Sequence, residues 1–571
     1  MSSPMGLGQI SRSVIGARES MPRESGEPDA PVLAEPPATS PAGTATVRAT
    51  SAATRGSFAL VLHSHLPWLA HHGAWPVGEE WLYQAWGSSY LPLLDVLDDL
   101  AAEGRRNLLT LGITPVLAAQ LDDPHSVRGF HTWLGFWQAR SEELAGDRDP
   151  DLRALAGYEF SQASAAHEAH QQRGPLTSSF RRLADAGAVE LLGGPASHAF
   201  QPLLDDDLVA VGLQVGLADS VIRFGDRPRG IWAPECGYRP GLEEAYQAAG
   251  IGHFMMDGPT FLHVGAQPWA GRRVGDSDVI AFARDLEVSY RVWSPKRGYP
   301  SDPHYRDFHA MHHDSGFRPA RVTSFHTKAH EKAPYDPASV PAVIERDARD
   351  FVDRVVARLA AVEAARGEPG LVVAAFDTEL FGHWWHEGPR WLARVLRLLP
   401  EAGVELCTLA GAVDAGLVDG ACNFQPGSWG SGKDWRVWAG TAVADIVADN
   451  ERLTRRWRGY LGRPSQARTP ALDQLAREAL LALSSDWAFM ISKDSAAGYA
   501  RARHDLHHRR FQALADAIDA DAATDSGVTG APQLAARLRR SDGPFGHLDA
   551  RVLGVASEQL GVPGRALTTR R

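Results

Sequence analysis

Residues 370–379 read GLVVAAFDTE, an apolar run that ends in the polar triplet Asp377-Thr378-Glu379. They follow PASVPAVIERDARDFVDRVVARLAAVEAARG (337–367), in which apolar residues recur with the spacing of an amphipathic helix. A long helix leading into a short buried strand is typical of a parallel sheet, because parallel strands need a crossover connection. This stretch therefore predicts an α/β fold in which Asp377 ends a strand.

The same alternation extends along most of the chain. Helical patterns such as LPLLDVLDDLAAEG (91–104) and GLEEAYQAAG (241–250) separate short apolar runs that turn or polar residues bound. These runs predict further strands at 58–62, 107–115, 189–195, 229–235, 252–258, 279–285, 321–326 and 404–410. Seven or eight strands alternating with helices predict a complete or distorted (β/α) barrel.

Composition and periodicity divide the chain into further parts. Residues 1–55 are rich in Ala, Ser, Pro, Thr, Gly and Glu without periodicity, which predicts a disordered tail. We expect the barrel over 56–422, with a helical insertion at about 123–185 that is too long for a simple connection. Amphipathic helices over 423–520 predict a C-terminal helical domain, and 521–571 is expected to be a loosely ordered tail.

Overall composition excludes several classes of protein. The chain has 571 residues, 44% hydrophobic and 22% charged, as expected for a globular protein. Its net charge of −11 gives no basic field for nucleic acid or anionic lipid. Three scattered cysteines exclude a disulfide framework and fit a reducing compartment. We see neither a membrane span nor a secretory signal, so we expect a cytoplasmic protein without membrane or nucleic-acid partners.

Two acidic residues, Glu235 and Asp377, each end an apolar run in a different βα unit, with Trp232, Trp384 and Trp385 nearby. Carboxyl ends of parallel barrel strands share one face, so both acids are expected in one cleft. Cleavage of a glycosidic bond needs such a pair, one carboxylate at the anomeric carbon and one acid at the leaving oxygen. The alternative is that either acid is a structural partner of an arginine or a helix N-cap.

Histidines leave a second question open. His63 and His65 end the first strand, where they could hold a metal ion, bind sugar hydroxyls or only pack in a loop. His383 and His386 have helical spacing, but no third ligand with a recognised spacing accompanies either pair. We therefore expect no metal and no organic cofactor. The segment GSWGSGKD (427–434) has phosphate-loop spacing, yet Asp434 replaces the Mg²⁺-binding hydroxyl and no strand precedes it.

Five segments in order resemble the motifs of glycoside hydrolase family 57, and most closely those of its α-1,4-glucan branching members. The resemblance covers roughly residues 57–510. The segments are HSHLPW (63–68), GGPASHAFQPLL (193–204), WAPECGY (232–238), AAFDTELFGHWW (374–385) and SSDWAFMISK (484–493). It implies a distorted, incomplete (β/α)7 barrel with the inserted helical subdomain and a C-terminal α-helical domain.

The resemblance also implies roles for single residues. Glu235 matches the nucleophile and Asp377 the general acid/base of a retaining mechanism. The implied substrate is an α-1,4-glucan of the glycogen or starch type, bound as donor and acceptor by an enzyme that we expect to be a monomer. The residues expected to contact glucan are His63, His65, Trp75, Trp81, Arg284, Trp293, Ser301, Trp429, Trp438 and Asp486.

Transfer of the cleaved chain to a 6-hydroxyl would make an α-1,6 branch, whereas transfer to water would be hydrolysis. Ser301 stands where branching relatives often have Gly, and the stretch 257–279 is short and lacks the Tyr that a longer loop carries there. Hydrolysis and 4-α-glucanotransfer within the family therefore stay as alternatives. From other classes come a metal-dependent deacetylase or amidohydrolase using His63, His65 and Asp377, and an inactive glucan-binding protein.

Overall fold

The computed structural model describes residues 54–74, 77–294, 298–312, 314–324, 326–461, 468–523, 530–551 and 553. At its centre parallel strands run side by side in the order β8-β1-β2-β3, then β4-β5-β7, and a parallel bridge between Gly193 and Ile231 joins the two groups. The ends of this sheet meet where the Asp285 backbone N–H donates to the Val373 carbonyl (2.7 Å). The result is a distorted (β/α)7 barrel, as the sequence predicted.

The barrel strands range in length from two residues in β4 to eight in β1. They are β1 (Ser57–Ser64), β2 (Leu109–Ile113), β3 (Val189–Leu192), β4 (Gly230–Ile231), β5 (His253–Met256), β7 (Ile280–Ala283) and β8 (Leu371–Asp377). Accessory strands β9 (Glu405–Leu406), β6 (Gly271–Val274) and β10 (Val418–Cys422) extend the sheets.

Burial of β1 on both faces explains why its sequence is a continuous apolar run. Ala59 and Val61 point into the small interior cluster with Trp232, whereas Phe58 and Leu60 pack outward against the helical layer. Because side chains alternate along a strand, one unbroken apolar segment supplies both contacts. The polar residues that follow such a run are then forced to the end of the barrel.

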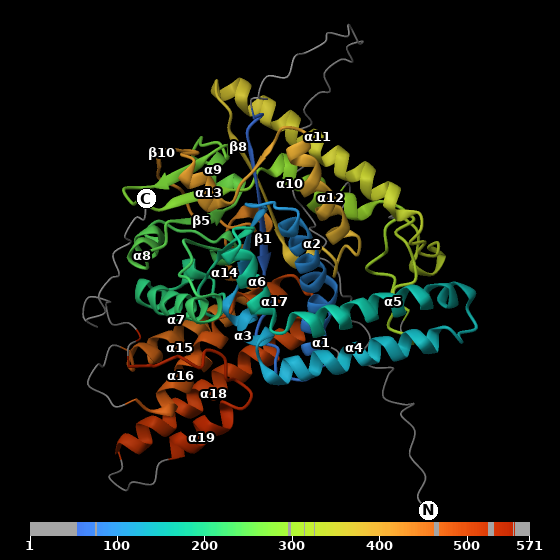
Figure 1. Ribbon diagram of the computed structural model, residues 1–571. Helices are drawn as coiled ribbons and strands as arrows, with labels where there is room; N and C mark the ends of the chain where they lie inside the picture. Colours follow the sequence, from blue (N-terminus) through green and yellow to red (C-terminus); the bar gives the residue numbers. More distant parts are fainter. Residues whose placement is uncertain are drawn as a thin grey trace, which may run out of the picture.

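Helices cover the outside of the barrel (Figure 1). The barrel-layer helices are α1 (Glu79–Ala85), α2 (Leu91–Ala102), α3 (Pro115–Leu121), α6 (Leu176–Asp185), α7 (Asp206–Phe224), α8 (Leu242–Ala248), α9 (Gly258–Leu262), α10 (Leu286–Trp293), α11 (Val340–Arg366), α12 (Gly388–Glu401) and α13 (Leu409–Asp414). The inserted subdomain between β2 and β3 contains α4 (Pro124–Leu144) and α5 (Pro150–Arg173), a long antiparallel pair that projects from one side of the molecule.

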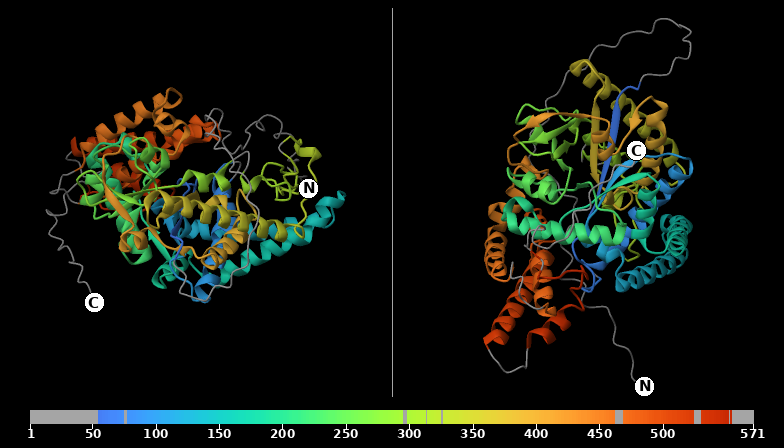
Figure 2. Two further views of the ribbon diagram at one scale, coloured as in Figure 1. Left: turned by 90° about the horizontal axis from the view of Figure 1, so that it is seen from above. Right: turned by 60° about the vertical axis from the view of Figure 1, so that its left-hand side comes forward.

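The C-terminal helices form a separate bundle below the barrel (Figure 2). They are α14 (Arg436–Ala439), α15 (Ala444–Arg458), α16 (Pro470–Ala482), α17 (Ser485–Ser492), α18 (Ala497–Ala523) and α19 (Gly530–Leu538). The expected loose tail from residue 521 is wrong for 530–551, because Ala535, Leu538 and Phe545 are buried in the core of this bundle. The expected N-terminal tail lies outside the described residues except for its last two positions.

Some strand predictions fail. Residues 321–324 form no strand but belong to an irregular excursion, and His326, expected at a strand end, is exposed. The excursion pairs with itself through a bridge between Arg306 and Arg321, so a brief apolar run there has no sheet to join. The run 404–410 shrinks to β9, which pairs with the start of β1. Among the described helices, none combines the length and apolarity needed to cross a lipid bilayer.

Two helical glycines test how tightly this frame packs. A Cβ on Gly216 of α7 would lie 2.1 Å from the Gly194 carbonyl oxygen, whereas one on Gly157 of α5 would meet nothing within 4 Å. We expect Gly216→Ala to lower the free energy of unfolding by about 1–3 kcal/mol through overpacking. Gly157→Ala should raise it by about 0.5–1 kcal/mol through helix propensity. Thermal and denaturant unfolding measure both changes. If Gly216→Ala and Gly157→Ala had the same effect on the free energy of unfolding, the close approach of α7 to residues 194–196 would be contradicted.

Candidate active site

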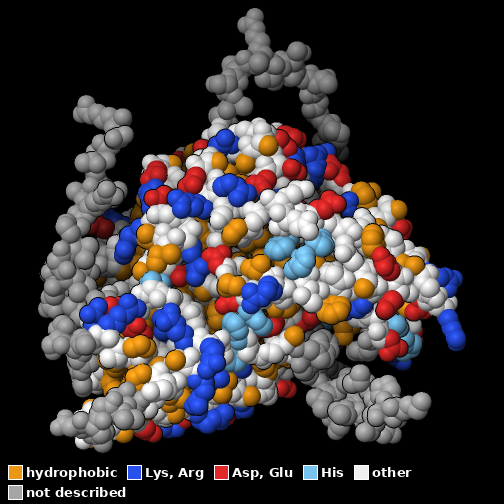
Figure 3. Space-filling model, turned by 60° about the horizontal axis from the view of Figure 1, so that its bottom comes forward, with side chains coloured by type: hydrophobic (Ala, Val, Ile, Leu, Met, Phe, Trp, Pro, Cys, Tyr) orange, Lys and Arg blue, Asp and Glu red, His pale blue; other side chains and the backbone are white. Residues whose placement is uncertain are grey.

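The carboxyl ends of the barrel strands place the expected acids and histidines together. Register between β1 and β8 sets His63 beside Asp377. Glu235 follows β4 in a tight turn (Pro234–Cys236). Figure 3 views the molecule from the side where these strands end, and histidine side chains gather there among hydrophobic and charged ones.

The turn that carries Glu235 is strained. Glu235 (φ 61°) and Cys236 (φ 49°) are both left-handed, a conformation that non-glycine residues rarely adopt and that surrounding contacts must hold. The loop 427–434 supplies such contacts. The backbone N–H of Trp429 donates to the backbone carbonyl of Glu235 (3.0 Å), and Tyr238 pairs with Gly427 in an antiparallel bridge.

Glu235 is 7% exposed, and its carboxyl group receives two side-chain hydrogen bonds. The indole N–H of Trp429 donates to Oε2 (2.9 Å), and the hydroxyl of Ser485 donates to Oε1 (2.8 Å). Burial raises the pKa of Glu235 to about 7, although both hydrogen bonds oppose the shift by stabilising the carboxylate. Glu235 therefore changes charge near neutral pH.

Asp377 differs from Glu235 in its surroundings. Its half-buried carboxyl group has no hydrogen-bond partner among the residues that the structure describes. Burial, together with the charges of Glu379 and Glu235, raises the pKa of Asp377 well above its ordinary value. The two acids therefore differ in their surroundings, because Glu235 receives two hydrogen bonds that stabilise its charge and Asp377 receives none from the described residues. Different surroundings are what allow two carboxyl groups to take different roles, one as nucleophile and one as acid.

Glu379, which the sequence analysis left without a role, completes this acidic group. It accepts hydrogen bonds from the Tyr90 hydroxyl and from the backbone N–H of His65 (3.2 Å). Burial raises its pKa to about 7. Its position inside the motif around Asp377 was the available signal, but its contacts with Tyr90 and His65 connect distant parts of the chain.

Histidines form a stacked group beside Glu235. The rings of His65 and His198 lie 3.8 Å apart, and His63 stacks on Trp232 at 4.3 Å. His65 Nε2 bonds Asp486 Oδ2 (2.9 Å), and its Nδ1 bonds the Thr114 hydroxyl (3.0 Å). Burial alone would lower the pKa of His65, but the adjacent Asp486 raises it. This edge of the site offers donors and acceptors suited to sugar hydroxyls.

His65, His198 and Asp486 are close enough to share a metal ion. However, the two imidazole rings are stacked with only 22° between their planes, so their in-plane lone pairs lie in two nearly parallel planes and are poorly placed to meet at one ion. Tetrahedral metal sites need convergent ligands. A second group, His72, His507 and Asp542, lies elsewhere, where Arg510 already pairs with Asp542. These features favour hydrogen bonding over metal binding.

Arg284, which we expected to contact substrate, lies in a buried ion cluster. It is buried, pairs with Asp257 (2.6 Å) and lies 5.4 Å from the ring centroid of Trp429. Lys433 joins the cluster, with Nζ donating to the Trp429 carbonyl (3.1 Å) and lying 3.4 Å from Asp257. The segment with phosphate-loop spacing therefore holds Trp429 over Glu235.

The remaining expected contact residues are scattered around this centre. Trp81 is half-buried near Tyr499, and Trp293 is half-buried with its edge toward Trp384 (6.1 Å). Ser301 is half-buried in the turn Tyr299–Ser301. Trp438 is 1% exposed and stacks on Phe200, so it packs the domain junction. Trp75 lies outside the described residues.

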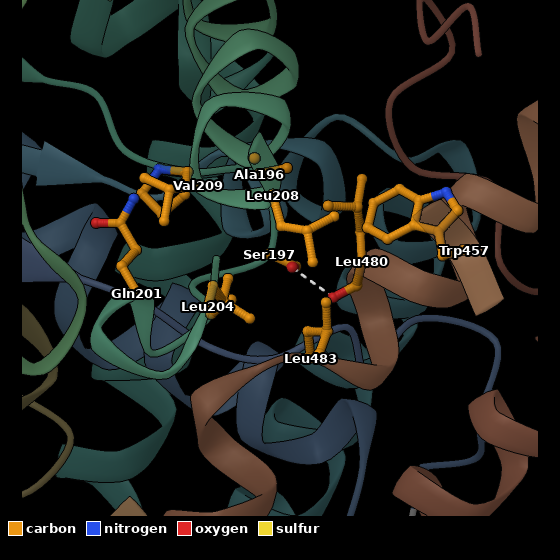
Figure 4. A pocket seen from close by; sticks show the side chains of 12 residues that line it. Ala196, Ser197, Gln201, Leu204, Leu208, Val209, Trp457, Leu480 and Leu483 are labelled. Carbon is orange, nitrogen blue, oxygen red and sulfur yellow. Dashed lines mark hydrogen bonds between the residues drawn. The ribbon is translucent and has the colours of Figure 1, made fainter. Parts of the chain in front are cut away.

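A small, mostly apolar cavity lies beside the site, between α7 and the C-terminal bundle (Figure 4). Ser197 donates to the Leu480 carbonyl at its edge, and Trp457, Leu480 and Leu483 line the bundle side. This seam anchors the segment that carries His198 to the helical domain.

Comparisons with known proteins place these features in context. Residues 59–418 match the family model of glycosyl hydrolase family 57, and 446–553 match the C-terminal model of 1,4-alpha-glucan branching enzymes. A "Probable 1,4-alpha-glucan branching enzyme" of Mycobacterium tuberculosis is 50% identical over 524 residues, covering 87% of this chain and 98% of the relative.

Solved structures agree with the sequence matches. The crystal structure of a family 57 branching enzyme from Thermococcus kodakaraensis, in complex with glucose, matches with a TM-score of 0.83 and 31% identity, covering 86% of this chain and 96% of that one. The α-amylase AmyC of Thermotoga maritima matches with a TM-score of 0.76 and 27% identity, covering 88% and 99%.

The buried ion cluster behind Trp429 can be tested against an exposed pair. Asp257→Asn would leave Arg284 and Lys433 without their buried anion, and we expect a loss of about 3–5 kcal/mol in unfolding free energy. Asp414→Asn removes the exposed partner of Arg229 (2.7 Å) and should cost at most about 1 kcal/mol. Denaturant unfolding measures both. A small effect of Asp257→Asn would contradict a structural role for the cluster.

Proposed function

Because the chain belongs to glycosyl hydrolase family 57, we propose that it is a retaining α-1,4-glucan branching transferase. The observation that carries the proposal is the pairing of Glu235, whose carboxyl group receives two hydrogen bonds, with Asp377, a second acid at the same barrel end whose pKa is raised well above its ordinary value. The match of 446–553 to the branching-enzyme C-terminal model and the 50% identical relative support the branching activity.

In the first half of the reaction, a Glu235 oxygen attacks the anomeric carbon of an α-1,4-linked chain. The bond from that carbon to the glycosidic oxygen breaks as Asp377 gives this oxygen its proton, and a glycosyl ester on Glu235 forms. In the second half, ionised Asp377 takes the proton of an acceptor 6-hydroxyl, whose oxygen attacks the same carbon. The ester breaks, Glu235 is regenerated, and an α-1,6 branch results.

Residues around the acids have roles consistent with this reaction. His65 and Asp486, linked at 2.9 Å, are proposed to bind hydroxyls of the sugar at the cleavage point. Trp429 is proposed to contact glucan while its N–H orients Glu235. Trp81, Trp293 and Ser301 are proposed as more remote contacts. No residue is assigned to a metal or an organic cofactor.

Hydrolysis is the second candidate, and one segment favours it. The stretch 257–279 forms α9 and β6, and β6 pairs with the first residues of β7 (Arg273 with Ile280). The Trp269 carbonyl accepts from Leu371 N–H at the start of β8. The later part of this stretch therefore lies at the amino ends of the strands and covers nothing at the catalytic edge. A lid that excludes water would favour transfer.

We also propose a monomeric enzyme of the cytoplasm that acts in glycogen biosynthesis. The absence of cysteine pairing among Cys236, Cys407 and Cys422, which are all free thiols, fits a reducing compartment. Size-exclusion chromatography with light scattering tests the oligomeric state.

The test of the reaction uses linear amylose and two readouts from one incubation. Proton NMR counts α-1,6 linkages, and a colorimetric assay counts new reducing ends. A branching transferase makes α-1,6 linkages with few reducing ends. Rising reducing ends without α-1,6 signal would replace branching by hydrolysis, and new chain lengths without either would indicate 4-α-glucanotransfer.

Glu235→Gln should reduce turnover of amylose by about 10³-fold or more, because the amide cannot form the glycosyl ester. The exposed Glu244→Gln on the neighbouring helix α8 serves as the matched control and should retain wild-type turnover. Circular dichroism checks that both variants fold. Near-normal activity of Glu235→Gln would remove Glu235 from the mechanism.

The pH dependence follows from the two carboxyl groups. Since Glu235 must be ionised and its pKa is raised to about 7, kcat/KM should increase with pH through the neutral range. Since Asp377 must be protonated, kcat/KM should fall again at higher pH as this group ionises. Full activity at pH 5 would contradict the buried state of Glu235.

A further inference from the structure

A hydrogen-bonded chain of side chains leads away from Glu235 and crosses from the helical domain into the barrel. The Ser485 hydroxyl contacts Glu235 Oε1 (2.8 Å) and His198 Nδ1 (2.9 Å). His198 Nε2 lies 3.1 Å from His63 Nε2. The last nitrogen, His63 Nδ1, is buried and has no hydrogen-bond partner.

The direction of each bond follows from the carboxylate. An ionised carboxylate only accepts, so the single hydrogen of Ser485 points to Glu235 and its oxygen accepts from His198 Nδ1–H. A neutral imidazole that carries hydrogen on Nδ1 has a bare Nε2, which must accept from His63 Nε2–H. His63 Nδ1 is then also bare. Among the imidazole nitrogens of His63 and His198, it is the one without a hydrogen-bond partner. An unpaired acceptor costs less free energy than an unpaired N–H.

Burial supports the neutral state that this chain requires. His63 and His198 are both buried, and desolvation lowers the pKa of each well below its ordinary value. A proton on both Nε2 atoms would set two N–H groups against each other at 3.1 Å. The neutral, one-way arrangement avoids that repulsion.

Backbone contacts hold Ser485 in place. Its N–H donates to the His198 carbonyl (3.1 Å), and Ser484 forms a bridge with Ala199. The start of α17 is thus attached to the segment that carries His198. Backbone hydrogen bonds therefore fix the position of the Ser485 hydroxyl relative to the His198 imidazole, in addition to the bond between the two side chains.

We propose that Ser485 is a positioning residue, through which a one-way relay from His63 and His198 holds the Glu235 carboxylate ionised and in its reactive orientation. The relay rests on the proposed role of Glu235 as nucleophile. It means that the helical domain completes the catalytic centre of the barrel, because Ser485 comes from α17.

Other charged or titratable groups also face Glu235 and are the same in each variant below. They are His65, which directly follows β1, Asp377 from β8, Asp486 from α17 and Cys236 from the same turn.

The first experiment compares Ser485→Ala with Ser492→Ala in the full-length chain, with amylose as substrate. Ser492 lies at the other end of α17, where its hydroxyl donates to the Val437 carbonyl. Loss of a hydrogen bond to a charged acceptor should move the acidic limb of kcat/KM upward by about one to two pH units in Ser485→Ala. The limb of Ser492→Ala should coincide with wild type.

The second experiment tests the link to His198. Asn at position 198 tolerates the left-handed backbone (φ 59°) and carries an N–H near the place of Nδ1, so His198→Asn should keep the wild-type acidic limb. His198→Gln lacks a donor there, and the limb should move upward by about half a unit. In a Ser485→Ala background neither change should move it further.

The relay would be overturned if the pH profiles of kcat/KM for Ser485→Ala and wild type coincided. It would also be overturned if each His198 substitution moved the acidic limb equally in the wild-type and the Ser485→Ala backgrounds. Those failures differ from failure of the proposed function, which would be an active Glu235→Gln variant. An inactive Glu235→Gln enzyme with an unshifted Ser485→Ala profile would leave the nucleophile intact and remove only the relay.

Discussion

Burial of one carboxylate, that of Glu235, is the constraint on which the rest of the site depends. A charged group removed from water must receive hydrogen bonds or lose its charge. Glu235 receives them from Trp429 and Ser485, which lie about 190 and 250 positions further along the chain. The left-handed turn at Glu235 is held because the loop that carries Trp429 is bonded to it.

Each of the two donors has its own support. Trp429 is held by the buried cluster of Asp257, Arg284 and Lys433, in which the two cations share one buried carboxylate. Ser485 is held by α17 and by backbone bonds to the His198 segment. The junction between the barrel and the helical domain thus supplies one of the two hydrogen bonds that Glu235 receives.

In the proposed mechanism, branching and hydrolysis share the step that breaks the α-1,4 bond. Glu235 and Asp377 would serve both reactions, since only the acceptor differs in the second half. Asp257, at the start of the stretch 257–279, lies behind Trp429, whereas residues 269–273 lie at the amino ends of the strands. Solved structures named as a branching enzyme and as an α-amylase match this chain with TM-scores of 0.83 and 0.76, so one fold accommodates both named activities.

The sequence by itself determined the barrel and its two acids. A strand buried on both faces must be a continuous apolar run, so the polar residue that ends it, as in Asp377, is visible without coordinates. Only the tertiary structure decided that Ser485 reaches Glu235, that Arg284 lies behind Trp429, that Trp438 is buried, and that 321–324 forms no strand. Periodicity in the sequence indicates which face of a helix or strand is buried. It does not indicate which side chain a polar group bonds, or whether a brief apolar run finds a sheet to join, because these depend on contacts between residues far apart in the sequence.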